Sequence, residues 1–211
     1  MKTAVLLDMD GTLLDTLADL HHAVNHALES CGYPARTLEE VCRFVGNGAR
    51  QLIRLATPEG GDQEAVMAAF IPYYAENCNR LTKPYIGIVE ALAVLKEKYA
   101  LAIVSNKPDV AAKELAQIYF PGIYALGESP ACPRKPAPDM VFQAMKDLGA
   151  ERCVYVGDSD VDIRTAENAG APCLSVTWGF RGQAELLAAG ARHFCHDPAA
   201  LPDAIDAILK R

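Results

Sequence analysis

The sequence predicts an α/β protein, in which a parallel β-sheet is covered by helices and carries one long helical insertion. Short apolar runs typical of buried strands alternate with amphipathic stretches of helical spacing. The interval between the first two runs is far too long for one crossover helix and contains only helix-type patterns. A chain of 211 residues with 51% hydrophobic residues can bury a core of this size.

Four short apolar runs are the predicted strands of the sheet. They are Ala4–Asp8, Leu101–Ser105, Cys153–Gly157 and Pro172–Thr177. Helical spacing of apolar residues predicts helices between them, around 88–95, 115–118 and 141–148. Right-handed crossovers would place such helices on both faces of a Rossmann-like sheet, with ligands at the carboxyl ends of its strands.

The insertion follows the first strand and spans residues 15–79. Apolar residues from Leu17 to Leu28 form one helical stripe, and Thr37–Glu40 is a capping box that opens a second helix. The segment Asp62–Asn79 is a further predicted helix, with Pro72 as a kink. We therefore expect two domains, a helical cap at 15–79 and a catalytic core. The core comprises residues 1–14 and 80–211.

Charge and cysteine content narrow the possible partners. A net charge of −7 argues against an extended nucleic-acid or anionic-membrane footprint. No apolar run approaches the roughly 20 residues that span a bilayer. Seven scattered cysteines without a close pair suit a reducing compartment better than a disulfide frame. We expect a cytoplasmic protein, monomeric or homodimeric, with a small-molecule partner.

Two acidic residues end the first predicted strand. Asp8 and Asp10 are separated by one residue, and Gly11 follows them, so both carboxylates fall near one point at the open edge of the sheet. A turn with solvated acids would produce the same pattern. The other strand ends decide between these interpretations.

Phosphate-type donors and a lysine occur at comparable positions. Ser105 and Asn106 end the second predicted strand just before a helix start at Pro108, where they could be N-caps or a phosphate seat. Lys135 stands between Arg134 and Pro136 ahead of the third strand, where a plain surface loop is the alternative.

Three acids follow the third predicted strand. Asp158, Asp160 and Asp162 open a helix, where negative charge is favoured even without a function. Clustered carboxylates are also the ligands that hold Mg²⁺, completed by water and substrate phosphate. Acids, phosphate donors, a lysine and metal-type acids thus gather in order at one edge of one sheet, which favours a functional site.

This ordered set resembles the motifs of the haloacid dehalogenase superfamily of phosphotransferases. Asp8–Leu13 is similar to its first motif, Ser105-Asn106 to its second, Lys135-Pro136 to its third, and Gly157–Asp162 to its fourth. The resemblance covers essentially the whole chain. It implies a haloacid dehalogenase-like core, and the helical insertion is similar in position and size to the cap of subclass I.

The resemblance implies a role for each acidic residue. Asp8 would be the nucleophile that forms an aspartyl-phosphate, and Asp10 would be the general acid and base. Mg²⁺ would be held by the carboxylates of Asp8 and Asp158 and the backbone carbonyl of Asp10. Asp162 would act on the metal through water or from a second layer of contacts.

The resemblance also implies the residues that hold the phosphoryl group. Ser105, Asn106 and the backbone amides of Gly11 and Thr12 would hold its oxygens, while Lys135 offsets the negative charge. Members that cleave carbon–halogen or carbon–phosphorus bonds lack the acid at the position of Asp10, so both activities are unlike this chain.

Within subclass I the motifs are most similar to those of phosphoglycolate phosphatases. The residues that carry this are Asp15-Thr16, Val45–Gly48, Leu81–Tyr85, Ser105–Pro108 and Trp178–Phe180. The segment Leu126–Pro130 departs from the Gly-Gly-Asp that relatives commonly have. Pyrophosphatases, sugar phosphatases, nucleotidases and β-phosphoglucomutase share the catalytic motifs. A non-catalytic binding protein on the same fold is the remaining alternative.

The cap is expected to select the leaving group. Asn47 and Gly48 could present backbone amides to a small carboxylate, with Arg50 as a cationic partner. A simple turn between helices with Arg50 in solvent is the alternative. Arg181, after the fourth strand, is a further candidate.

Overall fold

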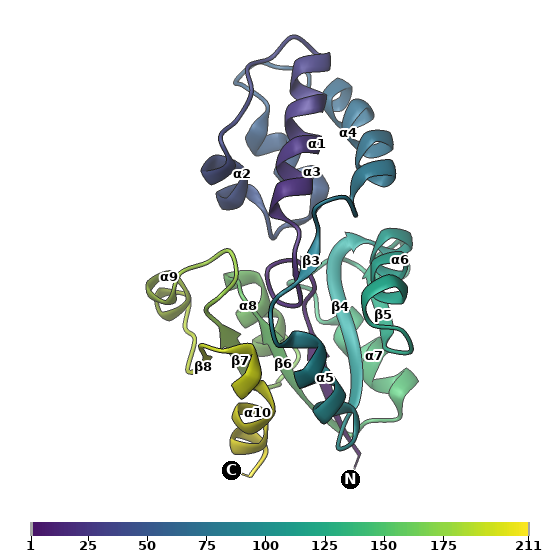
Figure 1. Cartoon of the computed structure of the whole chain (residues 1–211), viewed down its shortest axis with the longest axis vertical. Helices are drawn as coiled ribbons and strands as arrows, with labels where there is room; N and C mark the ends of the chain where they lie inside the picture. The colour runs from purple at the N-terminus through teal and green to yellow at the C-terminus, as the bar shows by residue number, and fades with distance from the viewer. Residues whose placement is uncertain (1, 211) are drawn as a thin grey trace.

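The protein has a parallel six-stranded sheet at its centre (Figure 1). The computed structural model describes residues 2–210. Within them the sheet has the order β5-β4-β1-β6-β7-β8, and each neighbouring pair is parallel. The strands are β1 (Thr3–Leu7), β4 (Ala100–Pro108), β5 (Tyr124–Glu128), β6 (Arg152–Gly157), β7 (Cys173–Val176) and β8 (His193–Cys195). The sequence therefore predicted the fold class correctly.

Helices cover both faces of this sheet because alternate strand residues point to opposite sides. Val5 and Leu7 of β1 pack in the cluster that includes α5 (Ile88–Lys96), α6 (Asp109–Tyr119) and α10 (Leu201–Leu209). Ala4 and Leu6 pack instead with α7 (Asp139–Leu148) and α8 (Asp160–Asn168). The short helices α9 (Gln183–Ala188) and η1 (Pro198–Ala200) complete the core.

The helical cap lies beyond the carboxyl ends of the strands, at the top of Figure 1. Its helices are α1 (Leu17–Ser30), α2 (Leu38–Phe44), α3 (Gly48–Ala56) and α4 (Gln63–Asn77). The predicted capping box is present. The Thr37 side chain accepts a hydrogen bond from the Glu40 amide, and the Glu40 carboxylate accepts one from the Thr37 amide. Helix α4 runs through Pro72 as one element.

Two antiparallel segments connect the cap with the core. β2 (Leu14–Asp15) enters the cap and pairs with β3 (Lys83–Pro84), which leaves it. The buried Asp19 of α1 reinforces this connection, since its carboxylate accepts from the amides of Arg80, Leu81 and Thr82 at 2.8–3.0 Å. One side chain thus ties the entry of the cap to its exit.

The four predicted strands are present, with bounds that differ by at most three residues. Two further strands of the central sheet, β5 and β8, lie outside the four predicted runs. β8 has three residues, and β5 has five with a glycine among them, so neither produces a long β-type run. The division at residues 14/15 and 79/80 remains a prediction, and the end residues 1 and 211 lie outside the described part. No helix within 2–210 is long and apolar enough to cross a membrane.

Candidate active site

Three neighbouring strands deliver the predicted site residues to one edge of the sheet. β1 lies between β4 and β6, and Asp8 follows the end of β1 directly. Ser105 comes from β4, and Asp158 follows β6. The Asp8 amide donates to the Val156 carbonyl at 2.9 Å, which continues the β1–β6 ladder one residue further. The parallel topology thus brings together side chains that lie about 50 or more residues apart in the sequence.

Lys135 connects two of the acids. Its ammonium lies 2.7 Å from Asp8 Oδ1 and 2.7 Å from Asp162 Oδ1, and its side chain is 2% exposed. The other oxygen of Asp162 accepts from the Ser159 amide at 3.1 Å and from the Ser159 hydroxyl at 2.6 Å. Both oxygens of Asp162 are therefore engaged with protein groups.

Asp158 is held from two other loops. Thr12 Oγ1 donates to its Oδ1 at 3.2 Å, and the amide of Phe180 donates to its Oδ2 at 2.7 Å. Gly11 packs directly on this carboxylate with φ +86°, and a Cβ there would lie 2.3 Å from Oδ2. Only glycine allows the turn after β1 to approach Asp158 so closely.

The electrostatics of the cluster favour a cation. Burial, together with Asp162 and Asp158, raises the pKa of Asp8 well above its ordinary value, against the opposing effect of Lys135. Burial and the neighbouring Asp162 raise the pKa of Asp158 to about 7. Burial disfavours the charge on Lys135, but Asp162 and Asp8 outweigh it and raise its pKa. One lysine does not balance three buried carboxylates.

A divalent metal ion fits this excess of negative charge. Asp8, Asp158 and Asp162 each offer a carboxylate oxygen, and these oxygens lie within 4.8 Å of one another. Buried carboxylate oxygens are the ligands that Mg²⁺ takes in proteins, and a nearby cation removes the cost of burying their charge. The donor set is thus compatible with the predicted magnesium ion.

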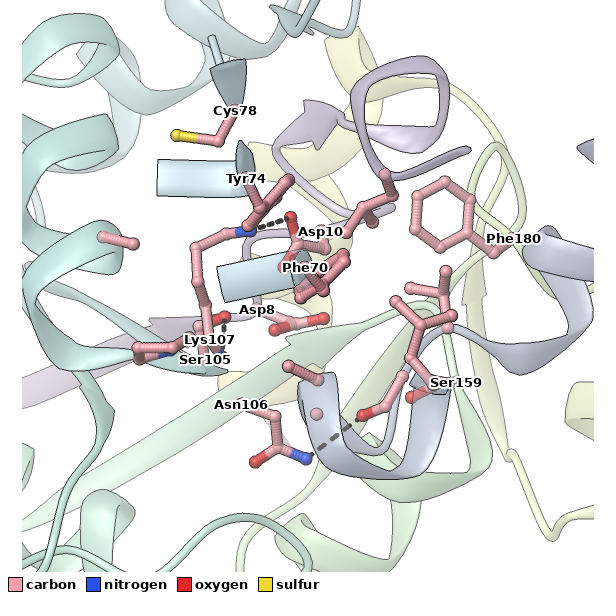
Figure 2. A pocket seen from close by; sticks show the side chains of 18 of the residues that line it. Asp8, Asp10, Phe70, Tyr74, Cys78, Ser105, Asn106, Lys107, Ser159 and Phe180 are labelled. Carbon is pink, nitrogen blue, oxygen red and sulfur yellow. Dashed lines mark hydrogen bonds and ion pairs between the residues drawn. The ribbon is translucent and has the colours of Figure 1, made fainter. Parts of the chain in front are cut away.

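A cavity of about 230 Å³ opens above the acids, between the core and the cap (Figure 2). Its floor includes Asp8, Asp10 and Ser105. Most of its walls are apolar, and they come from the cap and from the start of α6. Among the wall residues are Leu20, Leu52, Phe70, Ile71, Val110 and Ala111. Apolar walls with a few polar groups at one end are typical of a small-ligand site.

Some predicted phosphate donors are already engaged by protein atoms. The amides of Gly11 and Thr12 donate to the carbonyls of Leu14 and Met9 within the turn. The Asn106 amide group donates to the Gly46 carbonyl of the cap at 3.1 Å and the Lys135 carbonyl at 3.2 Å, and it accepts from the Lys135 amide at 2.6 Å. Asn106 thus fixes the loop that carries Lys135.

The predicted cap residues are spread over different surroundings. Gly48 lines the cavity, whereas the carbonyl of Asn47 accepts from Arg134 at 3.3 Å. Arg50 lies outside the cavity lining, with its side chain 71% exposed and 2.8 Å from Glu64. Arg181 lines the cavity, but its guanidinium donates to carbonyls at the end of α2, Cys42 at 2.9 Å and Val45 at 2.7 Å.

Two polar residues of the cavity had been given no role from the sequence. Lys107 is buried, and its ammonium lies 3.2 Å from Asp10 Oδ1 and 2.5 Å from the hydroxyl of Tyr74 in α4. Strand alternation could have indicated Lys107, since it stands two positions after Ser105 in β4. No local pattern indicates Tyr74, because it reaches the cavity from α4 in the helical insertion.

Fold and site together define an α/β enzyme with a buried aspartate-rich centre under a helical cap. Comparison with known proteins gives the family. The model of haloacid dehalogenase-like hydrolases matches residues 5–176, and the chain belongs to this family.

Individual relatives span nearly the whole chain. A phosphoglycolate phosphatase of Rhodobacter capsulatus is 35% identical and covers 98% of both chains. A plasmid-encoded phosphoglycolate phosphatase of Cupriavidus necator is also 35% identical, over 95% of this chain and 91% of its own length. A crystal structure from Lactobacillus delbrueckii subsp. bulgaricus, provisionally named phosphoglycolate phosphatase, is 38% identical. It superposes with a TM-score of 0.91 and covers 97% of this chain and 98% of its own.

Proposed function

We propose that this enzyme is a Mg²⁺-dependent phosphatase that hydrolyses a small phosphate monoester, 2-phosphoglycolate, through an aspartyl-phosphate on Asp8. The observation that carries the proposal is the buried cluster in which Lys135 bridges Asp8 and Asp162 beside Asp158, at the floor of a small cavity. The full-length similarity to proteins named phosphoglycolate phosphatase supports this substrate.

In this mechanism Asp8 attacks phosphorus and displaces the alcohol. The Lys135 ammonium, 2.7 Å from Asp8, offsets the charge of the carboxylate and of the transferring phosphoryl group. The hydroxyl of Ser105, on the floor of the cavity, donates to a phosphoryl oxygen. Water then attacks phosphorus of the aspartyl-phosphate, which releases inorganic phosphate and restores Asp8.

Asp10 moves the protons of both steps. It gives a proton to the oxygen of the leaving alcohol and takes one from the attacking water. Its position on the floor of the cavity, two residues after Asp8 and beside Lys107, is suitable for this role.

The carboxylates of Asp8 and Asp158 and the backbone carbonyl of Asp10 would hold Mg²⁺. A bound magnesium ion would supply positive charge to the phosphoryl oxygens. Asp162 is proposed to act on the metal through water or from a second layer of contacts, while Lys135 and Ser159 hold its two oxygens. The contacts from Thr12 and Phe180 orient Asp158.

The remaining substrate contacts are candidates for the organic part and the phosphate. Asn106 and the backbone amides of Gly11 and Thr12 are proposed for the phosphoryl oxygens, which they would reach by giving up their present contacts within the protein. The turn formed by Asn47 and Gly48 is proposed for the carboxylate, with Arg50 as the least favourably placed of the set, because its guanidinium pairs with Glu64.

The proposal also includes an arrangement and a location. Residues 15–79 act as a cap domain over the core formed by 1–14 and 80–211. The protein works in the cytoplasm as a monomer or homodimer, which agrees with its seven free cysteines.

A panel of phosphate esters tests the proposed function. We expect Mg²⁺-dependent release of inorganic phosphate, with the highest kcat/KM for 2-phosphoglycolate and measurable turnover of p-nitrophenyl phosphate. A metal-loaded protein that turns over no ester would be a non-catalytic binding protein. Conversion of a hexose 1-phosphate into the 6-phosphate would make it a mutase instead.

A further inference from the structure

A second buried lysine lies in the wall of the cavity. The Lys107 side chain is 3% exposed, and its ammonium lies 3.2 Å from Asp10 Oδ1, 2.5 Å from the Tyr74 hydroxyl and 4.7 Å from the centre of the Tyr74 ring (Figure 2). A buried ammonium is costly unless it is paired and hydrogen-bonded. The contacts with Asp10 and Tyr74 offset this cost, so the fold holds the Lys107 ammonium at a defined position between them.

The two buried lysines serve different aspartates. Lys135 reaches the site from the loop before α7 and contacts Asp8 and Asp162, whereas Lys107 reaches it from β4 and contacts Asp10. The proposed nucleophile and the proposed acid–base group therefore have separate cationic partners. A separate partner for Asp10 can fix the direction of its carboxylate without affecting Asp8.

Tyr74 brings the cap into this arrangement. It belongs to α4, is buried, and stacks on Phe70 with 5.2 Å between ring centres. Its hydroxyl contacts Lys107, which is a core residue. The Lys107 ammonium is thus held between Asp10 on one side and the cap on the other. The contact from Tyr74 exists only where α4 lies over the end of β4.

We propose that Lys107 and Tyr74 are positioning residues, which hold the Asp10 carboxylate in place to protonate the leaving alcohol and make this placement depend on the cap. The inference rests on the proposed function, because it requires Asp10 to be the general acid. Lys107 and Tyr74 act through Asp10.

A direct contact between Lys107 and an anionic group of the substrate is the competing explanation. The observed geometry favours positioning, since the ammonium already donates to the Tyr74 hydroxyl and forms an ion pair with Asp10. The two explanations predict different patterns over substrates, which makes them separable.

The test compares kcat/KM for three phosphate esters in Lys107→Met and Tyr74→Phe. Nitrophenolate leaves without a proton, whereas the alkoxides of 2-phosphoglycolate and ethyl phosphate require one. For Lys107→Met we expect kcat/KM to fall about 30- to 100-fold for both alkyl esters, within the usual range for a general acid, and less than about 3-fold for p-nitrophenyl phosphate. Tyr74→Phe should also lower kcat/KM more for the alkyl esters than for p-nitrophenyl phosphate, but the loss for the alkyl esters should be smaller, about 5-fold.

Matched controls exist on the same elements or nearby. Lys113→Met removes an exposed lysine that pairs with Asp109 in α6. Tyr73→Phe removes the hydroxyl of the residue that precedes Tyr74 in α4. Neither residue belongs to the cavity lining, and we expect both variants to keep kcat/KM for all three esters.

Three outcomes would overturn the inference. Equal losses for all three esters would assign Lys107 a general structural role. A loss confined to 2-phosphoglycolate, with ethyl phosphate unaffected, would make Lys107 a substrate ligand. The third outcome uses Asp10→Asn as a reference variant. If Asp10→Asn lowers kcat/KM for the two alkyl esters selectively and Lys107→Met does not, the inference alone fails. If Asp10→Asn itself keeps them, the proposed role of Asp10 fails.

Discussion

The floor and the walls of the cavity are built in opposite ways. On the floor, the carboxylates of Asp8, Asp158 and Asp162 each contact a lysine, a hydroxyl or an amide, and all three are buried. The walls are mainly apolar side chains from the cap and α6. The Asp10–Lys107–Tyr74 contact is a polar link between the two regions.

This difference separates chemistry from selectivity. A network in which each charge has a partner tolerates few changes, because removal of one member leaves a buried charge uncompensated. An apolar wall can exchange one side chain for another of similar volume at little cost. Under the proposed function, the same floor would serve different phosphate esters while the wall selects the leaving group.

Substitution of Asp8 should have the largest effect. Asp8→Asn keeps the size of the side chain but removes the nucleophile, so we expect kcat to fall by at least about 10⁴-fold. The assay is phosphate release with Mg²⁺ for 2-phosphoglycolate and p-nitrophenyl phosphate. A variant that retains a tenth of the activity would assign the nucleophile to another residue.

Substitution of Lys135 should affect stability as well as turnover. Lys135→Met leaves Asp8 and Asp162 without their shared cation, and we expect a loss of about 3 kcal/mol in the free energy of unfolding without metal. Lys113→Met, which removes an exposed ion pair, should lose less than about 1 kcal/mol. Urea unfolding of both proteins in EDTA measures the difference. Equal losses would show that the floor is no more sensitive than the surface.

The metal-free floor should lose stability as the pH rises. The pKa of Asp158 is raised to about 7 in the folded protein, whereas an unfolded aspartate titrates near about 3.9. The folded state therefore holds this proton more tightly, and its contribution to stability is lost between about pH 4 and pH 7. Asp158→Asn removes the titrating group and should flatten this part of the Tm profile in EDTA.

Magnesium should reverse that loss above pH 7. At a hundred times Kd it should raise Tm by about 5–10 °C at pH 7.5. We expect less than half of that rise at pH 5, where protons compete for the carboxylates. A rise in Tm that is the same at both pH values would contradict a carboxylate metal site.

The smallest effect is expected on the cap side. Arg50→Ala should raise KM for 2-phosphoglycolate by about 3-fold and leave KM for p-nitrophenyl phosphate within error, if the guanidinium contributes to carboxylate binding. Steady-state kinetics with both esters measures the ratio. Equal values of KM for the variant and the unmodified enzyme would remove Arg50 from the set of substrate ligands.

The sequence predicted the floor better than the walls, for a physical reason. Parallel strands deliver the residues at their carboxyl ends to one edge, so the positions of Asp8, Ser105 and Asp158 followed from three apolar runs. The structure adds a capping box at Ser159, in which Asp162 accepts from the Ser159 amide; the sequence predicted a helix start here but not this contact.

Contacts between separate segments could not be predicted in this way. Asn106 remains a predicted phosphate ligand, and no local pattern indicates the contacts it makes with the backbone of Lys135 and Gly46. The Lys107–Tyr74 contact joins a strand end to a cap helix, and its geometry depends on how the helical insertion packs against the sheet and its helices. Helical periodicity predicts which face of α4 is buried, but not which core side chain it meets.

The central claim is that the floor transfers the phosphoryl group to Asp8, and chemical trapping tests it most directly. The enzyme is mixed with 2-phosphoglycolate and Mg²⁺, quenched within one turnover, and treated with borohydride, which reduces an acyl phosphate to an alcohol. The account predicts homoserine at position 8 in the peptide mass spectrum, absent without substrate and in Asp8→Asn. Rapid phosphate release with no modified residue at position 8 would contradict it.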